Sequence, residues 1–216
     1  MMQMKGLFPV PFGYDQYPNP EALNTALRRL FLAREAEGSR HANPGPITLR
    51  NEQLFESHFK LFSWPDAEIV ELRNFCLSRL AQLVSELNGY DERTRARLDI
   101  RTDAWFHVTR RNGFFGVHNH PLASWSGVYC VSAGKNDADQ PDSGLLNFLH
   151  PHIGQAMYVD PGNEHLKQPF GIQNYGLMLQ PGQLVLFPSW LLHQVLPFYG
   201  EGERITVAFN CSFSLR

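Results

Sequence analysis

Two histidines separated by one residue are the feature that most constrains this chain of 216 residues. His118 and His120 lie in residues 116–121, a stretch with strand-forming character. Side chains two residues apart on a β-strand project from the same face, so both imidazoles can reach a single metal ion. A third histidine, His193, lies far downstream. The pattern predicts a metal site of His118, His120 and His193, assembled when the fold brings distant strands together.

Two alternatives to this triad stay open. The usual facial triad for ferrous iron has a carboxylate two residues after its first histidine, and His120 occupies that place here. A site with only one of His118 and His120 bound, and water in the third position, is the weaker form. His150 and His152 form a second pair with the same spacing, but Pro151 between them interrupts regular strand geometry. We rank that pair below the first.

A basic residue follows the last histidine. Arg204 comes eleven residues after His193, on a predicted strand, with Thr206 two residues further on. A guanidinium with a neighbouring hydroxyl suits a carboxylate inside a barrel, because arginine binds carboxylates through two parallel hydrogen bonds. The competing interpretation is a surface ion pair of Arg204 with Glu201 or Glu203, worth ~0–1 kcal/mol.

The remaining pattern predicts a mainly β fold with supporting helices. Apolar residues at helical spacing indicate one helix over residues 20–37 and a second from 64–66 to 88–89. Short strands separated by turn residues follow residue 97. We expect strands at 100–110, around the two histidines, and at 126–131, 144–149, 177–179, 184–187, 194–196 and 205–213. This succession is typical of a β-sandwich or a jelly roll.

The length suits one domain, which we expect to span residues 1–216, with an extended lead-in and supporting helices over 1–96 and a jelly-roll core over 97–216. A net charge of -2 argues against nucleic acid as a partner. The sequence lacks a long apolar run for a membrane span and a signal peptide, and its three cysteines show no disulfide or zinc spacing. A cytoplasmic protein is expected, and a homodimer stays open.

Five blocks of the sequence resemble the 2-oxoglutarate/Fe(II)-dependent oxygenases of the bacterial and phage type. The blocks are Leu7-Phe8-Pro9 and residues 118–121, 126–129, 187–197 and 204–210. The resemblance implies a double-stranded β-helix (jelly-roll, cupin-like) fold, ferrous iron and 2-oxoglutarate as co-substrate. It implies that iron lies on His118, His120 and His193, and that Arg204 and Thr206 hold the distal carboxylate of 2-oxoglutarate. The expected reaction is hydroxylation of an unidentified substrate, with succinate and carbon dioxide as co-products.

The chain departs from this family at two places. Cys130 stands where the family has a second tyrosine, and His150-Pro151-His152 stands where it tends to have Asp-Pro-Arg. Both departures concern the contacts of the substrate and part of the co-substrate clamp. The side chains expected to line the pocket are Tyr129, Cys130, Asn147, His152 and Trp190. Apart from the metal ligands, no catalytic residue is expected.

Two other functions fit part of the pattern. A cupin-like metalloenzyme could use the three histidines without an oxo-acid, and a jelly-roll protein could bind the metal without turnover. The first gives Arg204 no task, and the second needs no open coordination position. Nickel or zinc could also take the place of iron in the purified protein.

Overall fold

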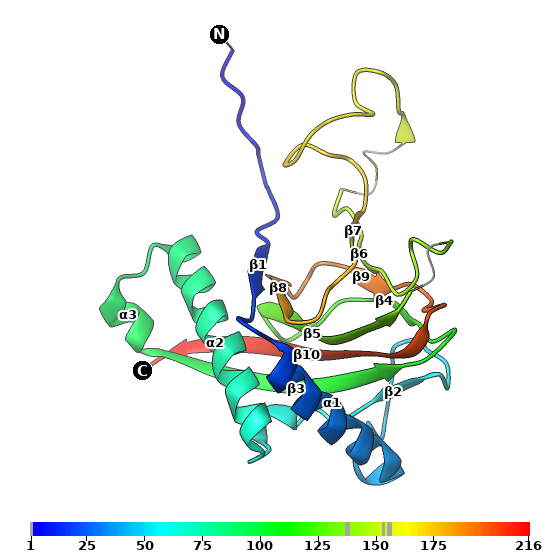
Figure 1. The fold of residues 1–216 in the computed structure, drawn as a ribbon. Helices are drawn as coiled ribbons and strands as arrows, with labels where there is room; N and C mark the ends of the chain where they lie inside the picture. Colours follow the sequence, from blue (N-terminus) through cyan, green and yellow to red (C-terminus); the bar gives the residue numbers. More distant parts are fainter. Residues whose placement is uncertain (1, 137–138, 153, 155–156) are drawn as a thin grey trace.

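Two antiparallel sheets and a small set of helices make up the fold (Figure 1). The computed structural model describes residues 2–136, 139–152, 154 and 157–216. The helices are α1 (Glu21–Ala36), α2 (Ala67–Asn88) and α3 (Glu92–Ala96), with short 3₁₀ turns η1 (Gly38–Arg40) and η2 (Leu61–Ser63). The strands are β1 (Gly13–Gln16), β2 (Leu54–Glu56), β3 (Leu98–Thr109), β4 (Phe115–His118), β5 (Trp125–Lys135), β6 (Leu146–Phe148), β7 (Tyr175–Leu177), β8 (Gln183–Pro188), β9 (His193–Val195) and β10 (Glu201–Leu215).

The larger sheet has the strand order β1-β8-β5-β10-β3-β2, and the smaller sheet has the order β4-β9-β6-β7. β10 is one of the two middle strands of the larger sheet and pairs with both β3 and β5. The two edge strands, β1 and β2, come from the first 96 residues, where the sequence predicted a lead-in and helices. The fold as a whole is mainly β, as the sequence predicted.

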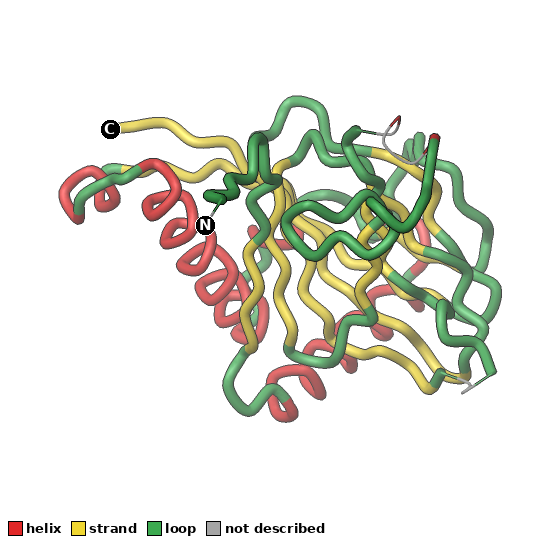
Figure 2. The backbone as a smooth tube through the Cα atoms, turned by 90° about the horizontal axis from the view of Figure 1, so that it is seen from above, coloured by secondary structure: helices red, strands yellow, loops and turns green. Residues whose placement is uncertain are grey.

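The two long helices lie where the sequence predicted them. α2 ends at Gly89, whose φ of 66° places it in the left-handed region that glycine adopts without steric cost. Figure 2 shows both helices on one side of the strands. Their apolar faces pack on the larger sheet, where the Phe31 and Phe106 rings stack at 4.3 Å. This helix-covered face leaves the opposite face of the sheet for the site.

Alternation along β3 decides which side chains enter the space between the sheets. Phe106 and Val108 belong to the core on the helix side. Trp105, His107 and Thr109 alternate with them, so they project toward the smaller sheet. Polar side chains thus lie inside the molecule in a regular pattern.

Two expectations about strands need correction. β4 ends at His118, so His120 lies two residues beyond the strand and is not on it. Pro121 lacks the N–H that a ladder would need, and Leu122 has a φ of 71°, so the extended backbone stops here. The predicted strand at 177–179 is β7 at Tyr175–Leu177, two residues earlier. Within the part of the chain described, no helix is both long and apolar enough to cross a bilayer.

Candidate functional site

The three predicted histidines meet at one end of the smaller sheet. His118 on β4 pairs directly with His193 on β9. His120 is held beside them by its backbone N–H, which donates to the Ser189 carbonyl at 2.9 Å. One ligand atom from each histidine lies within 4.8 Å of the other two. The fold therefore brings together the three histidines that the sequence singled out, and the coil after β4 positions His120.

Backbone carbonyls fix the rings of two of these histidines. His118 Nδ1 lies 2.8 Å from the Gly116 carbonyl oxygen, and His193 Nδ1 lies 2.9 Å from that of Leu191. A carbonyl oxygen only accepts, so each Nδ1 carries the proton and each Nε2 is left with a free lone pair. This arrangement is the usual second contact of a metal-binding histidine.

The electrostatics keep the three imidazoles neutral. Burial lowers the pKa of His120 to about 2, with further lowering from His193 and His118. Burial, followed by the proximity of His118, lowers the pKa of His193 to about 3. Burial also lowers the pKa of His118. Neutral nitrogen donors with free lone pairs fit ferrous iron, and they fit nickel or zinc as well.

Arg204 is a buried cation in the same interior. Its side chain is only 6% exposed, and burial lowers the pKa of its guanidinium. The competing interpretation, a surface ion pair of Arg204 with Glu201 or Glu203, is wrong. Glu203 pairs with Arg28 at 2.6 Å, and Glu201 pairs with Lys135 at 3.9 Å. Among the residues that the structure describes, no carboxylate pairs with Arg204. A buried cation without a protein partner is unfavourable unless a ligand supplies the anion.

Two threonines flank Arg204. Thr206 is 2% exposed and projects from the same face of β10, and Thr109 is the direct partner of Arg204 on β3. The Thr109 hydroxyl is buried and has no hydrogen-bond partner among the described residues. Gly144 lies against the guanidinium stem: a Cβ there would be 3.0 Å from Arg204 Cδ. A cation beside the unpartnered hydroxyl of Thr109 and the hydroxyl of Thr206 fits a carboxylate.

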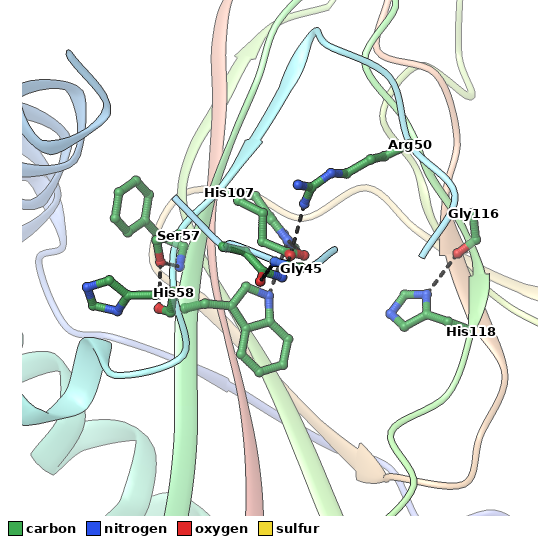
Figure 3. A network of polar contacts seen from close by, with 11 residues as sticks. Gly45, Arg50, Ser57, His58, His107, Gly116 and His118 are labelled. Carbon is green, nitrogen blue, oxygen red and sulfur yellow. Dashed lines mark hydrogen bonds and ion pairs between the residues drawn. The ribbon is translucent and has the colours of Figure 1, made fainter. Parts of the chain in front are cut away.

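A buried carboxylate lies behind the histidines. Glu56 on β2 forms an ion pair with Arg50 at 2.9 Å, and its other oxygen lies 3.1 Å from His107 Nε2. Trp105 Nε1 is 3.2 Å from the same nitrogen, and the Trp105 ring lies 5.7 Å from that of His120. Arg50 and His107 both contact the Glu56 carboxylate. Figure 3 shows their side chains close together, with His118 and Gly116 to one side.

The network of Glu56, Arg50 and His107 and the buried hydroxyl of Thr109 were not predicted from the sequence. From the sequence His107 is an ordinary residue, yet it is 8% exposed and its Nε2 lies 3.1 Å from a carboxylate oxygen of Glu56. The period-two spacing of Trp105, His107 and Thr109 was the available signal. Their burial depends on β2 and β10, which pair with β3 from distant parts of the chain.

The residues expected to line the pocket lie in different parts of the fold. Tyr129 is a correction: it packs in the helix-side core and its hydroxyl donates to Asn24 at 2.8 Å, so it does not face the interior. Cys130 does face the interior, and burial raises its pKa to about 12. Asn147 alternates with two interior residues of β6, and Trp190 is 53% exposed. His152 lines a cavity next to the site.

A family model described as "Putative 2OG-Fe(II) oxygenase" matches residues 103–210, half of the chain. The match runs from β3 to β10 and includes the three histidines and Arg204. No curated protein sequence matches the chain.

Solved structures share the fold at low sequence identity. A prolyl-4-hydroxylase from Pseudomonas putida is 18% identical, with a TM-score of 0.61 over 96% of this chain and 94% of that one. A prolyl hydroxylase from Trichoplax adhaerens is 15% identical, with a TM-score of 0.58 over 93% and 82%. HygX from Streptomyces hygroscopicus, solved with nickel and 2-oxoglutarate, is 11% identical, with a TM-score of 0.57 over 94% and 83%. The chain therefore has the double-stranded β-helix fold that the sequence predicted.

Proposed function

The chain belongs to the 2OG-Fe(II) oxygenase family, and from this premise we propose that its three clustered histidines hold the iron and that Arg204 holds 2-oxoglutarate. As a member of the family, the chain is an oxygenase that uses Fe(II) and 2-oxoglutarate. The observation that carries the residue assignment is the buried guanidinium of Arg204, which has no carboxylate partner among the described residues. A cupin-like enzyme without an oxo-acid would leave that cation unexplained.

The reaction we propose is hydroxylation of a carbon–hydrogen bond, with conversion of 2-oxoglutarate to succinate and carbon dioxide. Bound ferrous iron supplies the redox chemistry with oxygen. The protein contributes orientation and exclusion of water. His118, His120 and His193 each offer one neutral nitrogen, and three protein ligands leave coordination positions for the reactants.

Arg204 and Thr206 would hold the distal carboxylate of 2-oxoglutarate. The guanidinium can donate two parallel hydrogen bonds to a carboxylate, and the burial of the pair strengthens them. Thr109 adds a second hydroxyl opposite Arg204 on the neighbouring strand. A chain of contacts leads from Arg204 and Thr206 to the histidines. Its first step is the cross-strand pair of Thr206 and His107. The His107 ring lies 4.9 Å from that of Phe115, whose ring is 4.8 Å from that of His118.

The first test is anaerobic titration of the iron-loaded protein with 2-oxoglutarate, followed by the weak visible absorption band that the co-substrate gives on ferrous iron. Arg204→Ala should bind iron normally and need roughly 30- to 1000-fold more 2-oxoglutarate for the same band, because a buried charge pair loses about 2–4 kcal/mol. Arg204→Lys should recover part of this loss, since it keeps the charge without the two-pronged geometry.

Arg101→Ala is the matched control, because Arg101 is exposed on β3 of the same sheet. It should titrate like the unaltered protein. Unchanged 2-oxoglutarate affinity in Arg204→Ala would contradict the assignment of Arg204. The absence of a band in iron-loaded wild-type protein would contradict the site as a whole.

A further inference from the structure

A cavity of about 660 Å³ opens at the same end of the molecule as the three histidines. Three segments line it: residues 6–12 of the N-terminal stretch, residues 148–152 at the end of β6, and residues 168–175 leading into β7. Figure 1 shows the N-terminal stretch and the segment before β7 rising from the same end of the sheets. Gly6 approaches Pro169 so closely that a Cβ on Gly6 would lie 3.2 Å from the proline ring. The first and third walls therefore meet.

The register of the smaller sheet connects the cavity to the histidines. His118, His193, Phe148 and Tyr175 are successive partners across β4, β9, β6 and β7. Direct cross-strand partners project from the same face with neighbouring Cβ atoms about 5 Å apart. The first two of this row belong to the triad, and the other two line the cavity. The Phe148 ring lies 5.7 Å from that of His193, so the cavity begins one side chain away from the triad.

The walls of the cavity carry no formal charge of the lysine, arginine, aspartate or glutamate type among the described residues. Lys167 and Glu164 lie in the same part of the chain as the third wall, yet neither lines the cavity. Aromatic rings dominate instead, from Phe8, Phe12, Phe148, Phe170 and Tyr175. The polar groups on the walls are the imidazoles of His150 and His152, the amides of Gln168 and Gln173, and the phenol of Tyr175.

We propose that this cavity binds the primary substrate, and that the substrate is an uncharged, ring-containing small molecule with a few hydrogen-bonding groups. This inference rests on the proposed function, because it assigns the hydroxylated molecule to the same site. The volume is within the roughly 300–1000 Å³ of pockets that bury most of the surface of a small molecule. A charged group would lose its water without gaining a lysine, arginine or carboxylate partner on the described walls, which is strongly unfavourable. Rings that pack against aromatic side chains meet no such cost.

The binding test uses two dyes with the same ring skeleton, the uncharged N-phenylnaphthylamine and its sulfonate, anilinonaphthalenesulfonate. Both are titrated into zinc-loaded protein with 2-oxoglutarate present, and their fluorescence is followed. The uncharged dye should bind saturably, and the sulfonate at least about tenfold more weakly, because the described walls offer it no lysine or arginine. Equal affinity for the two dyes would overturn the inference.

Two variants locate the dye. Phe170→Asp places a carboxylate on the wall, and Leu7→Asp does so at a side chain 77% exposed, where folding is not at stake. Each should weaken the uncharged dye by about tenfold or more. Tyr90→Asp is the control, because Tyr90 is aromatic and 38% exposed, as Phe170 is, but lies beyond α2 and does not line the cavity. Equal loss in all three variants, or loss in none, would overturn the assignment of the dye to this cavity.

Manganese in place of zinc tests the proximity to the histidines. Bound manganese should broaden the proton resonances of the dye in the nuclear magnetic resonance spectrum, whereas zinc should not. Binding without broadening would mean that the cavity is not the substrate site. The 2-oxoglutarate absorption band, measured on Phe170→Asp, separates the two proposals. A normal band with lost dye binding supports both, and a missing band in the wild-type protein contradicts the proposed function whatever the dye does.

Discussion

At the scale of single residues, Glu56 shows how neighbouring polar groups keep a buried carboxylate ionised. Burial alone would raise its pKa, but the hydrogen bond to His107, the amide of Asn43 and the charge of Arg50 outweigh burial and lower the pKa to about 2. Its usual value is 4.5. The folded protein therefore releases the Glu56 proton more readily than the unfolded chain does. The ionised carboxylate stabilises the fold above about pH 4.5, and this contribution disappears as the pH falls toward 2.

Glu56→Gln should remove this part of the pH dependence. We expect a loss of up to about 3 kcal/mol at pH 7, because each unit of pKa difference corresponds to about 1.4 kcal/mol. The loss should shrink as the pH is lowered from 4.5 toward 2. Urea denaturation of the metal-free protein across this range measures it, with Glu52→Gln as the control at an exposed position of the same segment. A constant difference between variant and wild type would mean that the pKa of Glu56 is not lowered.

The same scale shows why the sequence predicted only part of the site. His118, His193 and Arg204 were identifiable because their residue types are rare at such spacing and their chemistry is specific. Tyr129 was misplaced because one residue of register decides which face of β5 a side chain occupies. Glu56 and Thr109 were missed because their partners are far away in the sequence: Arg204 lies 95 positions after Thr109 and meets it only across the sheet.

At the scale of elements, the helices were predictable from local signals and the shortest strands were not. The left-handed backbone conformation of Gly89 ends α2. The apolar stripe that predicts this helix consists of residues of α2 alone, so it can be read from one continuous stretch of sequence. β7 and β9 have three residues each, so their bounds depend on where β6 offers hydrogen-bonding partners. The predictions for β7 and β9 were therefore displaced by two residues and one residue, respectively.

Gly127 on β5 gives a prediction at this scale. A Cβ at this position would lie 2.3 Å from the ring of Phe209 on the paired strand β10, so the ring must move. Gly127→Ala should lower the free energy of unfolding by about 1–3 kcal/mol, the usual cost of overpacking a core. Thermal or urea denaturation measures this. Gly45→Ala is the control, because nothing lies within 4 Å of the new Cβ there, and it should change stability little. Equal effects of the two substitutions would contradict the packing of Phe209 against β5.

At the scale of the whole molecule, the three clustered histidines make the metal-free protein sensitive to acid. His120 and His193 have pKa values of about 2 and about 3 in the folded protein. In the unfolded chain both would take up protons below about pH 6.5. Unfolding therefore becomes easier as the pH falls below 6.5, by up to about 1.4 kcal/mol per pH unit for each histidine.

His120→Asn should make the stability of the metal-free protein less dependent on pH between 6.5 and 5, by up to about 1.4 kcal/mol per pH unit. Urea denaturation in the presence of a chelator measures the slope. His165→Asn is the control, because that side chain is 88% exposed, and its slope should match the wild type. An unchanged slope in His120→Asn would mean that this imidazole is not held neutral by its surroundings.

We infer that the whole chain acts as one oxygenase domain, because β1 and β2 from its first 96 residues complete the larger sheet. The family model covers residues 103–210, so these two edge strands and the N-terminal wall of the cavity lie outside the matched region. The shared core and the surroundings of the substrate thus come from partly different stretches of sequence.

This separation has an evolutionary consequence. His118, His193 and Arg204 stand on paired strands, where a substitution also disturbs the neighbouring strand, whereas the cavity takes two of its three walls from the N-terminal stretch and from the coil before β7. Coil tolerates exchange and insertion far better than a paired strand does. A lineage with this architecture can acquire a new target by altering those two walls and still inherit its reaction intact.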